Sequence, residues 1–555
     1  MTPRLSRRQW LQYALASAVS PGLLPSLHAF SEEGKGPSEN LAAAPMGGIP
    51  LWFNEDASHF FITRAGRQLT PDLVDALVDR YGGTQVGVML FNPSAMRTSY
   101  ASQVWDPIWK GYDPQGPNDQ PLFASTPVSF RRNARAWVHT AWQFNELGID
   151  PYVRWMASCR RWNISPWISL RMNDLHNTDD PLSFTHSDFW RDNPQFQLPP
   201  DRALDYGQPE VRQYVMRLIQ EVSTRYDFDG LELDWMRFPH YFAREQEDQG
   251  SIILGGFISE VRQILDQWQS RRRHPIHLSV RVPSRPQAAR GRGLDAVQWA
   301  KEGLLDYIVV TPLFSTIEYD MPLQEWRTLL GGTGVPLVAG LEAGLRPFPA
   351  WPFQKYNSLR SARGAAASLL DLGADGIYLF NYSDAFAAIW GIQDYQSLLQ
   401  EVGQLSTLVG KPRRHVLTYP DTWAPDEIPQ YPLPVRCLPW ETLRFQLPTG
   451  PISPDSRVRL RLGINQVLVA NVPRWNVQVN ETPCVYSGIV IPDEPRYVGL
   501  TYEFAVPREA IRRSYNTVTV FPSDLPPDES VQIEWVEFDF QPSPSFSPPR
   551  LKLYH

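Results

Sequence analysis

Cysteine and long apolar runs are both scarce in this chain of 555 residues. It has 3 cysteines, with no CxxC pair and no Cys/His cluster, so no zinc site is indicated. Beyond the N-terminus, no segment reaches the roughly 18 continuous apolar residues that a membrane-spanning helix requires. Cys437 and Cys484 lie in the same C-terminal part of the chain, where they could pair, whereas Cys159 has no evident partner.

A strong charge of either sign is absent as well. Lys and Arg total 52 against 59 Asp and Glu, which gives a formal net charge of −7. This mild acidity offers no electrostatic footprint for nucleic acid or for an anionic membrane surface. No Gly-rich dinucleotide fingerprint follows any apolar run, and we expect neither a cofactor nor a catalytic metal.

Tryptophan and proline, in contrast, are abundant, with 20 and 52 residues. The flat indole face with its single N–H suits stacking on sugar rings. Trp105, Trp109 and Trp235 are therefore candidate stacking platforms, although large aromatic side chains are more often packed in a core.

The N-terminus has the pattern of an export signal. Arg7 and Arg8 precede a short apolar stretch over 13–19, and Ala29 supplies a small residue near a cleavage point. The paired arginines resemble a twin-arginine signal, which directs folded proteins across the bacterial inner membrane. We expect residues 1–29 to be removed on export to the periplasm or beyond, and residues 30–46 to form a linker.

Residues 47–405 alternate short apolar runs with amphipathic stretches, which predicts a (β/α)₈ TIM barrel. An open doubly wound sheet is the rival architecture. Thr70, Ser361 and Asp295 are candidate helix N-caps. The predicted strands are 49–53, 86–91, 167–171, 230–234, 277–282, 307–311, 336–340 and 376–381. The predicted helices include 71–81, 211–226, 252–269, 296–302 and 362–372.

Residues 410–555 have a different texture, rich in proline and without helical periodicity. Alternating polar and apolar residues over 531–540 indicate a half-buried antiparallel strand. We expect an all-β sandwich, jelly-roll-like, that either binds sugar or braces the barrel. Its predicted strands are 457–463, 466–472, 475–479, 497–506, 517–522 and 531–540.

The segment that carries most chemistry is 226–239, YDFDGLELDWMRFP. Strand periodicity places Gly230, Glu232 and Asp234 on one face and the two leucines on the other. Because leucines pack against the surrounding helices, the two acids should point into the barrel, with Asp234 at its carboxyl-end mouth. A network of buried salt bridges is the alternative role for these acids.

The stretch 205–239 resembles the glycosyl hydrolase-like family 10 barrels, bacterial envelope proteins that act on glycans such as peptidoglycan. Residues 299–309 (WAKEGLLDYIV) and 373–380 (GADGIYLF) are similar to later segments of that family. The resemblance spans most of the barrel and none of the sandwich. It implies that Asp234 is the principal catalytic acid residue with Arg237 beside it, while Glu232 stands where the family usually has a non-acidic residue.

Residues 229–236 also resemble the strand-four signature of family 18 chitinases, Asp-Gly-x-Asp-x-Asp-x-Glu. That family's proton donor would fall on Met236, and a thioether cannot deliver a proton. The sequence therefore does not support chitinase-type substrate-assisted chemistry.

Other polar residues follow predicted strands and are candidates to line the mouth. Glu342 comes after the seventh strand and is the first candidate for the general acid opposite Asp234, ahead of Glu232 and Asp174. The candidate substrate-binding residues are Asn92, Arg97, Asn173, Asp174, His176, Trp235, Arg237 and Tyr382, with Asp384 nearby.

These observations favour an exported glycoside hydrolase that cleaves a polysaccharide or peptidoglycan glycan with two carboxyl groups, one as proton donor and one as nucleophile or base. The alternative is a catalytically inactive glycan-binding protein on the same scaffold, because barrels host many chemistries.

Overall fold

The computed structural model describes residues 49–352, 355–465, 473–491 and 499–542. The expected signal (1–29), the linker (30–46) and the predicted strand over 466–472 lie outside the described residues. No helix in the described ranges is both long and apolar enough to cross a membrane.

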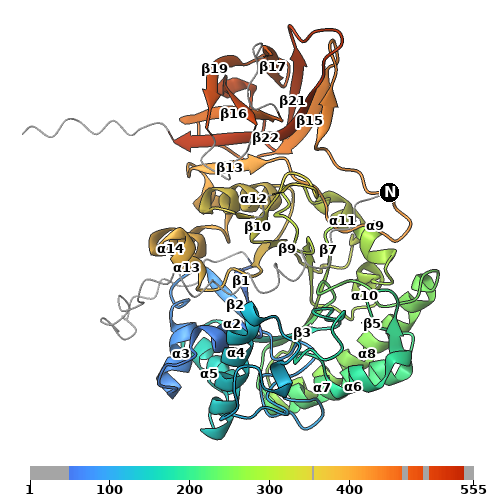
Figure 1. Cartoon of the computed structure of the whole chain (residues 1–555). Helices are drawn as coiled ribbons and strands as arrows, with labels where there is room; N and C mark the ends of the chain where they lie inside the picture. Colours follow the sequence, from blue (N-terminus) through green and yellow to red (C-terminus); the bar gives the residue numbers. More distant parts are fainter. Residues whose placement is uncertain (1–48, 353–354, 466–472, 492–498, 543–555) are drawn as a thin grey trace, which may run out of the picture.

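Eight parallel strands close into a barrel, as the alternation of apolar runs predicts (Figure 1). The chain order around the barrel is sequential, so each strand pairs with its predecessor and successor among the eight. The strands are β1 (Leu51–Glu55), β2 (Val86–Phe91), β3 (Ser165–Arg171), β6 (Gly230–Asp234), β7 (His277–Pro283), β8 (Tyr307–Thr311), β9 (Leu337–Leu341) and β12 (Gly376–Leu379).

Helices surround this barrel and bury their apolar faces against it. The longer ones are α3 (Pro71–Asp79), α4 (Val128–Glu146), α5 (Pro151–Arg161), α7 (Pro209–Arg225), α8 (Glu247–Arg272), α12 (Leu359–Asp371) and α14 (Ile392–Glu401). The shorter ones are α2 (His59–Thr63), α6 (Asp188–Asp192), α9 (Pro286–Arg290), α10 (Ala296–Lys301), α11 (Leu323–Leu329), α13 (Phe386–Trp390) and α15 (Leu405–Leu408). The loops also contain two short two-stranded sheets. One pairs β4 (Gln197–Leu198) with β5 (Ala203–Leu204), and the other pairs β10 (Gly344–Leu345) with β11 (Lys355–Tyr356).

Two of the three predicted helix caps are confirmed. The Thr70 hydroxyl accepts the Leu73 N–H, and the Asp295 carboxylate accepts the Gln298 N–H. The prediction of Ser361 as a cap is wrong. The helix begins earlier, and the Ser358 hydroxyl accepts the Ser361 N–H.

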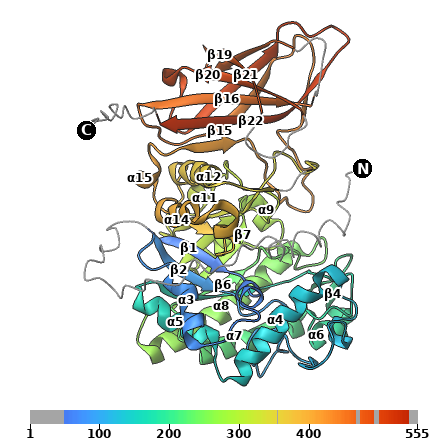
Figure 2. The same cartoon turned by 60° about the vertical axis from the view of Figure 1, so that its left-hand side comes forward.

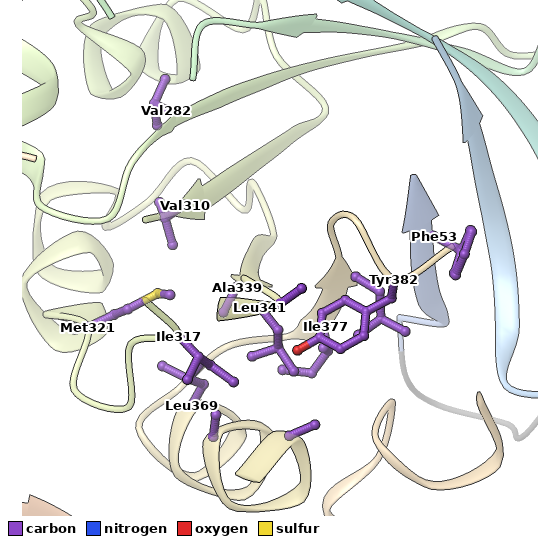
Figure 3. Packing of buried hydrophobic residues seen from close by; sticks show 14 of the residues in the cluster. Phe53, Val282, Val310, Ile317, Met321, Ala339, Leu341, Leu369, Ile377 and Tyr382 are labelled. Carbon is purple, nitrogen blue, oxygen red and sulfur yellow. The ribbon is translucent and has the colours of Figure 1, made fainter. Parts of the chain in front are cut away.

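Alternate residues of the barrel strands point to opposite sides. Outward residues such as Val310, Ala339 and Ile377 belong to the same buried core as Leu369 of α12 (Figure 3). Inward residues form a separate aromatic-rich cluster in the lower barrel, in which the Trp52 and Trp167 ring centroids are 4.8 Å apart. The lower interior is therefore filled, and polar chemistry is confined to the carboxyl ends of the strands.

Two antiparallel sheets follow the barrel and lie beside α12 (Figures 1 and 2). The first contains β13 (Arg413–Val416), β22 (Val531–Pro542), β16 (Ser456–Ile464), β20 (Leu500–Val506) and β19 (Val485–Val490), with β14 (Val435–Cys437) also paired to β22. The second contains β15 (Leu443–Pro448), β21 (Tyr515–Pro522), β17 (Trp475–Val479) and β18 (Thr482–Pro483).

The predicted half-buried strand β22 is in fact buried on both faces over much of its length. Its acidic residues Glu537 and Asp539 are fully buried, where they meet Arg414 of β13 and Arg360 of α12. The alternation identifies the strand correctly, but its polar face is turned to the barrel rather than to water.

The possible pairing of Cys437 with Cys484 is not formed, and both thiols are free. Cys437 ends β14, whereas Cys484 follows β18, and each sulfur lies against main-chain carbonyls of its own segment. Shared membership of one domain did not bring the two residues together.

The contact between α12 and β13 leaves no room for a side chain at Gly364. A Cβ there would lie 1.8 Å from the main-chain oxygen of Arg414. We expect Gly364→Ala to lower the free energy of unfolding by about 3 kcal/mol, because a backbone atom cannot yield as a side chain can. Urea unfolding measures the change.

Gly256 in α8 provides the matched control, because a Cβ there meets nothing within 4 Å. Gly256→Ala should stabilise the protein by about 0.5–1 kcal/mol through its helix propensity. Equal free energies of unfolding for the two variants would contradict the close approach of α12 to β13.

Candidate functional site

Glu232 and Asp234 both point into the barrel from β6, and both are fully buried. The strand register places Asp234 opposite Arg171 of β3 on one side and Arg281 of β7 on the other. Both acids therefore point inward, as the strand periodicity predicts, and two arginines flank Asp234.

Asp234 is held by a buried ion pair at the mouth. Both of its carboxylate oxygens accept from Nη1 of Arg281, at 2.9 and 3.0 Å, and Oδ1 also accepts the Met236 N–H at 2.9 Å. The side chains of Asp234 and Arg281 are 1% and 0% exposed, so this charge pair is sealed from solvent in the structure.

Glu232 lies one layer deeper in the barrel. Its Oε1 accepts from the Ser169 hydroxyl at 2.7 Å and from the Tyr378 hydroxyl at 2.9 Å. Its other oxygen has no hydrogen-bond partner in the described ranges. Burial raises the pKa of Glu232, and the charge of Asp234 raises it further.

Glu342 follows β9 at the barrel mouth and is 4% exposed. Its Oε1 accepts the Ala343 N–H at 2.9 Å, and no group among the described residues hydrogen-bonds Oε2. Burial raises the pKa of Glu342 to about 8, against the opposing pull of Arg281 and Arg237. Glu342 is thus a protonated acid near neutral pH, and it interacts with the same Arg281 that binds Asp234.

The loop after β3 forms a second charged group at the mouth. Arg171 donates to Asp174 at 2.9 Å and also pairs with Asp56. His176 Nδ1 lies 2.5 Å from the same Asp174. Burial alone would raise the pKa of Asp174, yet His176 and Arg171 hold it well below its usual range. The structure brings Asp174 and His176 together, as the predicted polar cluster requires. The carboxylate of Asp174 is, however, already paired with Arg171 and His176.

Several predicted substrate-binding residues are engaged in holding loops. Asn173 donates to the main-chain oxygens of Leu204 and His240 and accepts the Leu204 N–H. Tyr382 donates to the Glu342 carbonyl, so it positions that acid's backbone.

Asn92 and Arg97 likewise serve their own surroundings. The Asn92 side chain accepts the Ser94 N–H, and Arg97 donates to the His186 carbonyl. Both residues are buried.

Trp235 is not a stacking platform for sugar in this structure, because its ring is fully buried. It lies against Tyr206 and Tyr241, on the outward side of the strand that carries Asp234. Trp105 is 8% exposed and stacks on Tyr214, so it too is part of the core, whereas Trp109 is only half-buried.

Four residues of the mouth escaped the sequence prediction: Asp56, Arg281, Phe380 and Glu318. The alternation in the fifth predicted strand, 277–282, places Arg281 on the inward face, so a usable signal was present. Asp56 directly follows β1. Glu318 lies beyond β8 in a loop, where no periodicity marks it.

Glu318 is a further buried acid near the barrel mouth, 2% exposed. Its loop runs beside that of Glu342, because the Ile317 N–H donates to the Gly344 carbonyl at 2.7 Å. A cavity of about 380 Å³ between this loop and the C-terminal sheets is lined in part by Glu318. Burial raises the pKa of Glu318 to about 8, against the opposing effect of the nearby Ser284 hydroxyl.

The C-terminal region also shapes these loops. Asp421, beyond β13, accepts the N–H groups of Leu313, Phe314 and Ser315 at 2.7–3.0 Å. Glu427 forms a two-point ion pair with Arg285, just after β7. The segment between β13 and β14 therefore fixes the loops that follow β7 and β8.

No family model matches the sequence, and no curated protein matches it. Solved structures with a related fold include the glycoside hydrolase domain of PgaB (BpsB) from Bordetella bronchiseptica, with 10% identity, a TM-score of 0.37, and coverage of 64% of this chain and 99% of that one. The chitinase ChiW from Paenibacillus sp. str. FPU-7 has 12% identity and a TM-score of 0.35, over 63% of this chain and 33% of that one. A family 18 N-acetylglucosaminidase from Paenibacillus barengoltzii has 10% identity and a TM-score of 0.32, over 64% and 100%.

These structural neighbours are glycoside hydrolases, and this chain spans only a third of the chitinase chain. With TM-scores below 0.5, the likenesses carry no information about the activity of this chain. The chemistry of the mouth itself must support any function.

The raised pKa of Glu318 predicts a specific pH dependence of stability. In the unfolded chain Glu318 loses its proton above its ordinary pKa of 4.5, whereas in the folded protein it keeps the proton up to about pH 8. The free energy of unfolding therefore falls as pH rises from about 4.5 towards about 8. Glu318→Gln removes this loss. The free energy of unfolding of Glu318→Gln, measured relative to that of the wild type, should therefore increase by on the order of a few kcal/mol between about pH 5 and about pH 8.

Urea unfolding at the two pH values measures this gain, with Glu260→Gln as the control. Glu260 is an exposed carboxylate on α8, so its variant should follow the wild-type pH profile. A Glu318→Gln profile parallel to wild type would show that Glu318 is not buried as a neutral acid.

Proposed function

We propose that this chain is an exported glycoside hydrolase-like protein that cleaves glycosidic bonds in a polysaccharide or peptidoglycan glycan. Glu342 is the proton donor and Asp234 is the nucleophile or base. The observation that carries this proposal is the arrangement around Arg281, which interacts with an ion-paired carboxylate on β6 and with an unpaired, raised-pKa carboxyl group after β9.

The chemistry follows from the different environments of the two groups. Glycosidic cleavage needs one carboxyl group that delivers a proton to the leaving oxygen and a second that stabilises or attacks the positive sugar carbon. Glu342 holds its proton near neutral pH because of burial. The ion pair with Arg281 supports a charged Asp234. The pair thus has one acid and one base at the same mouth.

Glu232 and Asp174 fit the acid role less well than Glu342. Glu232 lies deeper and already accepts two hydroxyl hydrogen bonds, from Ser169 and Tyr378. The pKa of Asp174 is lowered despite its burial, so Asp174 has no proton to give. Both observations support the order in which the sequence ranked these acids.

The resemblance of 205–239 to the glycosyl hydrolase-like family 10 barrels supports a bacterial envelope glycan as the substrate, and the twin-arginine pattern supports export. Both remain part of the proposal, together with the β-sandwich as a brace for the barrel.

A non-catalytic glycan-binding protein is the second candidate, and one observation favours it. Asp234 is sealed, with both oxygens turned to Arg281. A substrate must displace part of this ion pair before Asp234 can reach a sugar carbon or a water.

Reducing-sugar release from a panel of glycans, peptidoglycan included, tests the catalytic proposal. Glu342→Gln keeps the shape of the side chain but cannot donate an acidic proton, so kcat should fall by about 10²–10⁴-fold. Asp234→Asn should also be inactive. For the wild type, kcat should decline as pH rises through about 8, where Glu342 loses its proton.

The exposed variant Glu260→Gln should keep wild-type activity, and thermal unfolding shows whether each variant is folded. Unchanged release by folded Glu342→Gln would remove Glu342 from the mechanism. If the wild type released no reducing sugar from any glycan but still bound glycans, the glycan-binding protein would replace the hydrolase as the proposed function.

A further inference from the structure

Three arginines meet at the barrel mouth, and among the described residues two of them contact a counter-ion. Arg171 pairs with Asp56 and Asp174, and Arg281 pairs with Asp234. Arg237, three residues beyond Asp234, makes no hydrogen bond and no ion pair within the ranges that the structure describes.

Arg237 lies in a confined setting despite this lack of a partner. Its guanidinium carbon is 5.2 Å from the centre of the Phe380 ring, and that of Arg281 is 3.8 Å from the same ring. Its Nε is buried. Burial lowers the pKa of Arg237 to about 10 and the charge of Arg171 lowers it further, while the charges of Asp174, Asp56 and Asp234, none of them in direct contact with Arg237, oppose this effect.

The backbone next to Arg237 is strained as well. Phe238 adopts a φ of 91°, which is costly for a residue with a bulky side chain. Its ring packs edge-on against His176, 5.0 Å between centroids, which ties the Arg237 loop to the loop after β3. The backbone that carries Arg237 is therefore tied to the loop after β3.

A partly desolvated cation without a counter-ion is unfavourable unless a ligand completes it. A guanidinium presents parallel N–H donors that match the two oxygens of a planar carboxylate, whereas a sugar hydroxyl uses only one of them. Arg281 also binds a carboxylate at the same mouth, that of Asp234, with both oxygens accepting from its Nη1.

We propose that Arg237 recognises an acidic group on the substrate, so that the glycan bound at this mouth carries carboxylate-bearing sugars. This inference rests on the proposed role of the mouth as a glycan site. A sulfate ester shares the anionic oxygens of a carboxylate, and the experiment separates the two sources.

Calorimetric binding of soluble acidic glycans to the full-length protein tests the proposal. Polygalacturonate, alginate and hyaluronan are each compared with the same polymer after reduction of its carboxyl groups, which keeps the linkages and removes the charge. Dextran sulfate is compared with dextran. We expect the wild type to bind at least one carboxylated polymer about 10-fold or more tightly than its reduced form.

Arg237→Gln should abolish this preference and leave the affinity for the reduced polymer unchanged, while Arg237→Lys should keep part of it. Arg244→Gln is the matched control, because it removes an equal charge from an exposed side chain seven residues away. Rising salt should weaken the wild-type preference and leave Arg237→Gln unaffected.

Several outcomes would overturn the proposal: equal binding of acidic and reduced polymers, binding of none of them, or an equal loss for both forms in Arg237→Gln. A preference for dextran sulfate alone would overturn the carboxylate assignment in favour of sulfate. Binding needs no bond cleavage, so an acidic preference without hydrolysis would defeat the proposed hydrolase and leave this inference standing.

Discussion

The buried ion pair between Asp234 and Arg281 is the interaction on which the mouth depends. Removing two charges from water is costly, and only close, well-oriented contact between them offsets that cost. The contact exists because β6 and β7 pair in a register that sets these two residues side by side. With Arg281 fixed there, its charge also reaches Glu342 across the barrel mouth and Glu232 one layer below.

A second set of buried charges joins the C-terminal sheets to the barrel. Glu537 and Asp539 on β22 meet Arg461 of β16, and Arg360 of α12 reaches Asp539 from the barrel. Leaving either acid without its arginines would leave a buried charge uncompensated, so the sheet and the helix stabilise one another. Asp421 extends the same dependence to the loop after β8.

The fold was largely predictable because its signals are local. Apolar runs of strand length mark each barrel strand, and the alternation in 230–234 sets the inward direction of Glu232 and Asp234. The same alternation places Trp235 outward, against the helices, so its burial was implicit in the pattern that located Asp234. Arg281 as the partner of Asp234 was less accessible, because a pairing across strands 47 residues apart depends on register.

The parts of the site that could not be predicted depend on long-range packing. The surroundings of Glu318 include the chain beyond β13, whose residues line the same cavity and whose Asp421 holds the loop after β8. The separation of Cys437 from Cys484 likewise follows from strand order, which composition does not encode.

The sealed state of Asp234 does not by itself decide between a catalyst and a binding protein. Nη1 of Arg281 binds both oxygens of Asp234, while its Nε and Nη2 have no acceptor in the described part of the chain. Both nitrogens are buried, so a ligand oxygen could reach Nη2 only after the mouth opens; it would then gain a hydrogen bond without first breaking the ion pair. A glycan that binds in this way would draw Arg281 towards itself and loosen its hold on Asp234, so that substrate binding and exposure of the base become one step. In a protein that only binds glycans, this movement of Arg281 would serve no purpose. A deeply buried acid such as Glu232, whose pKa is raised, would then cost stability without contributing to function.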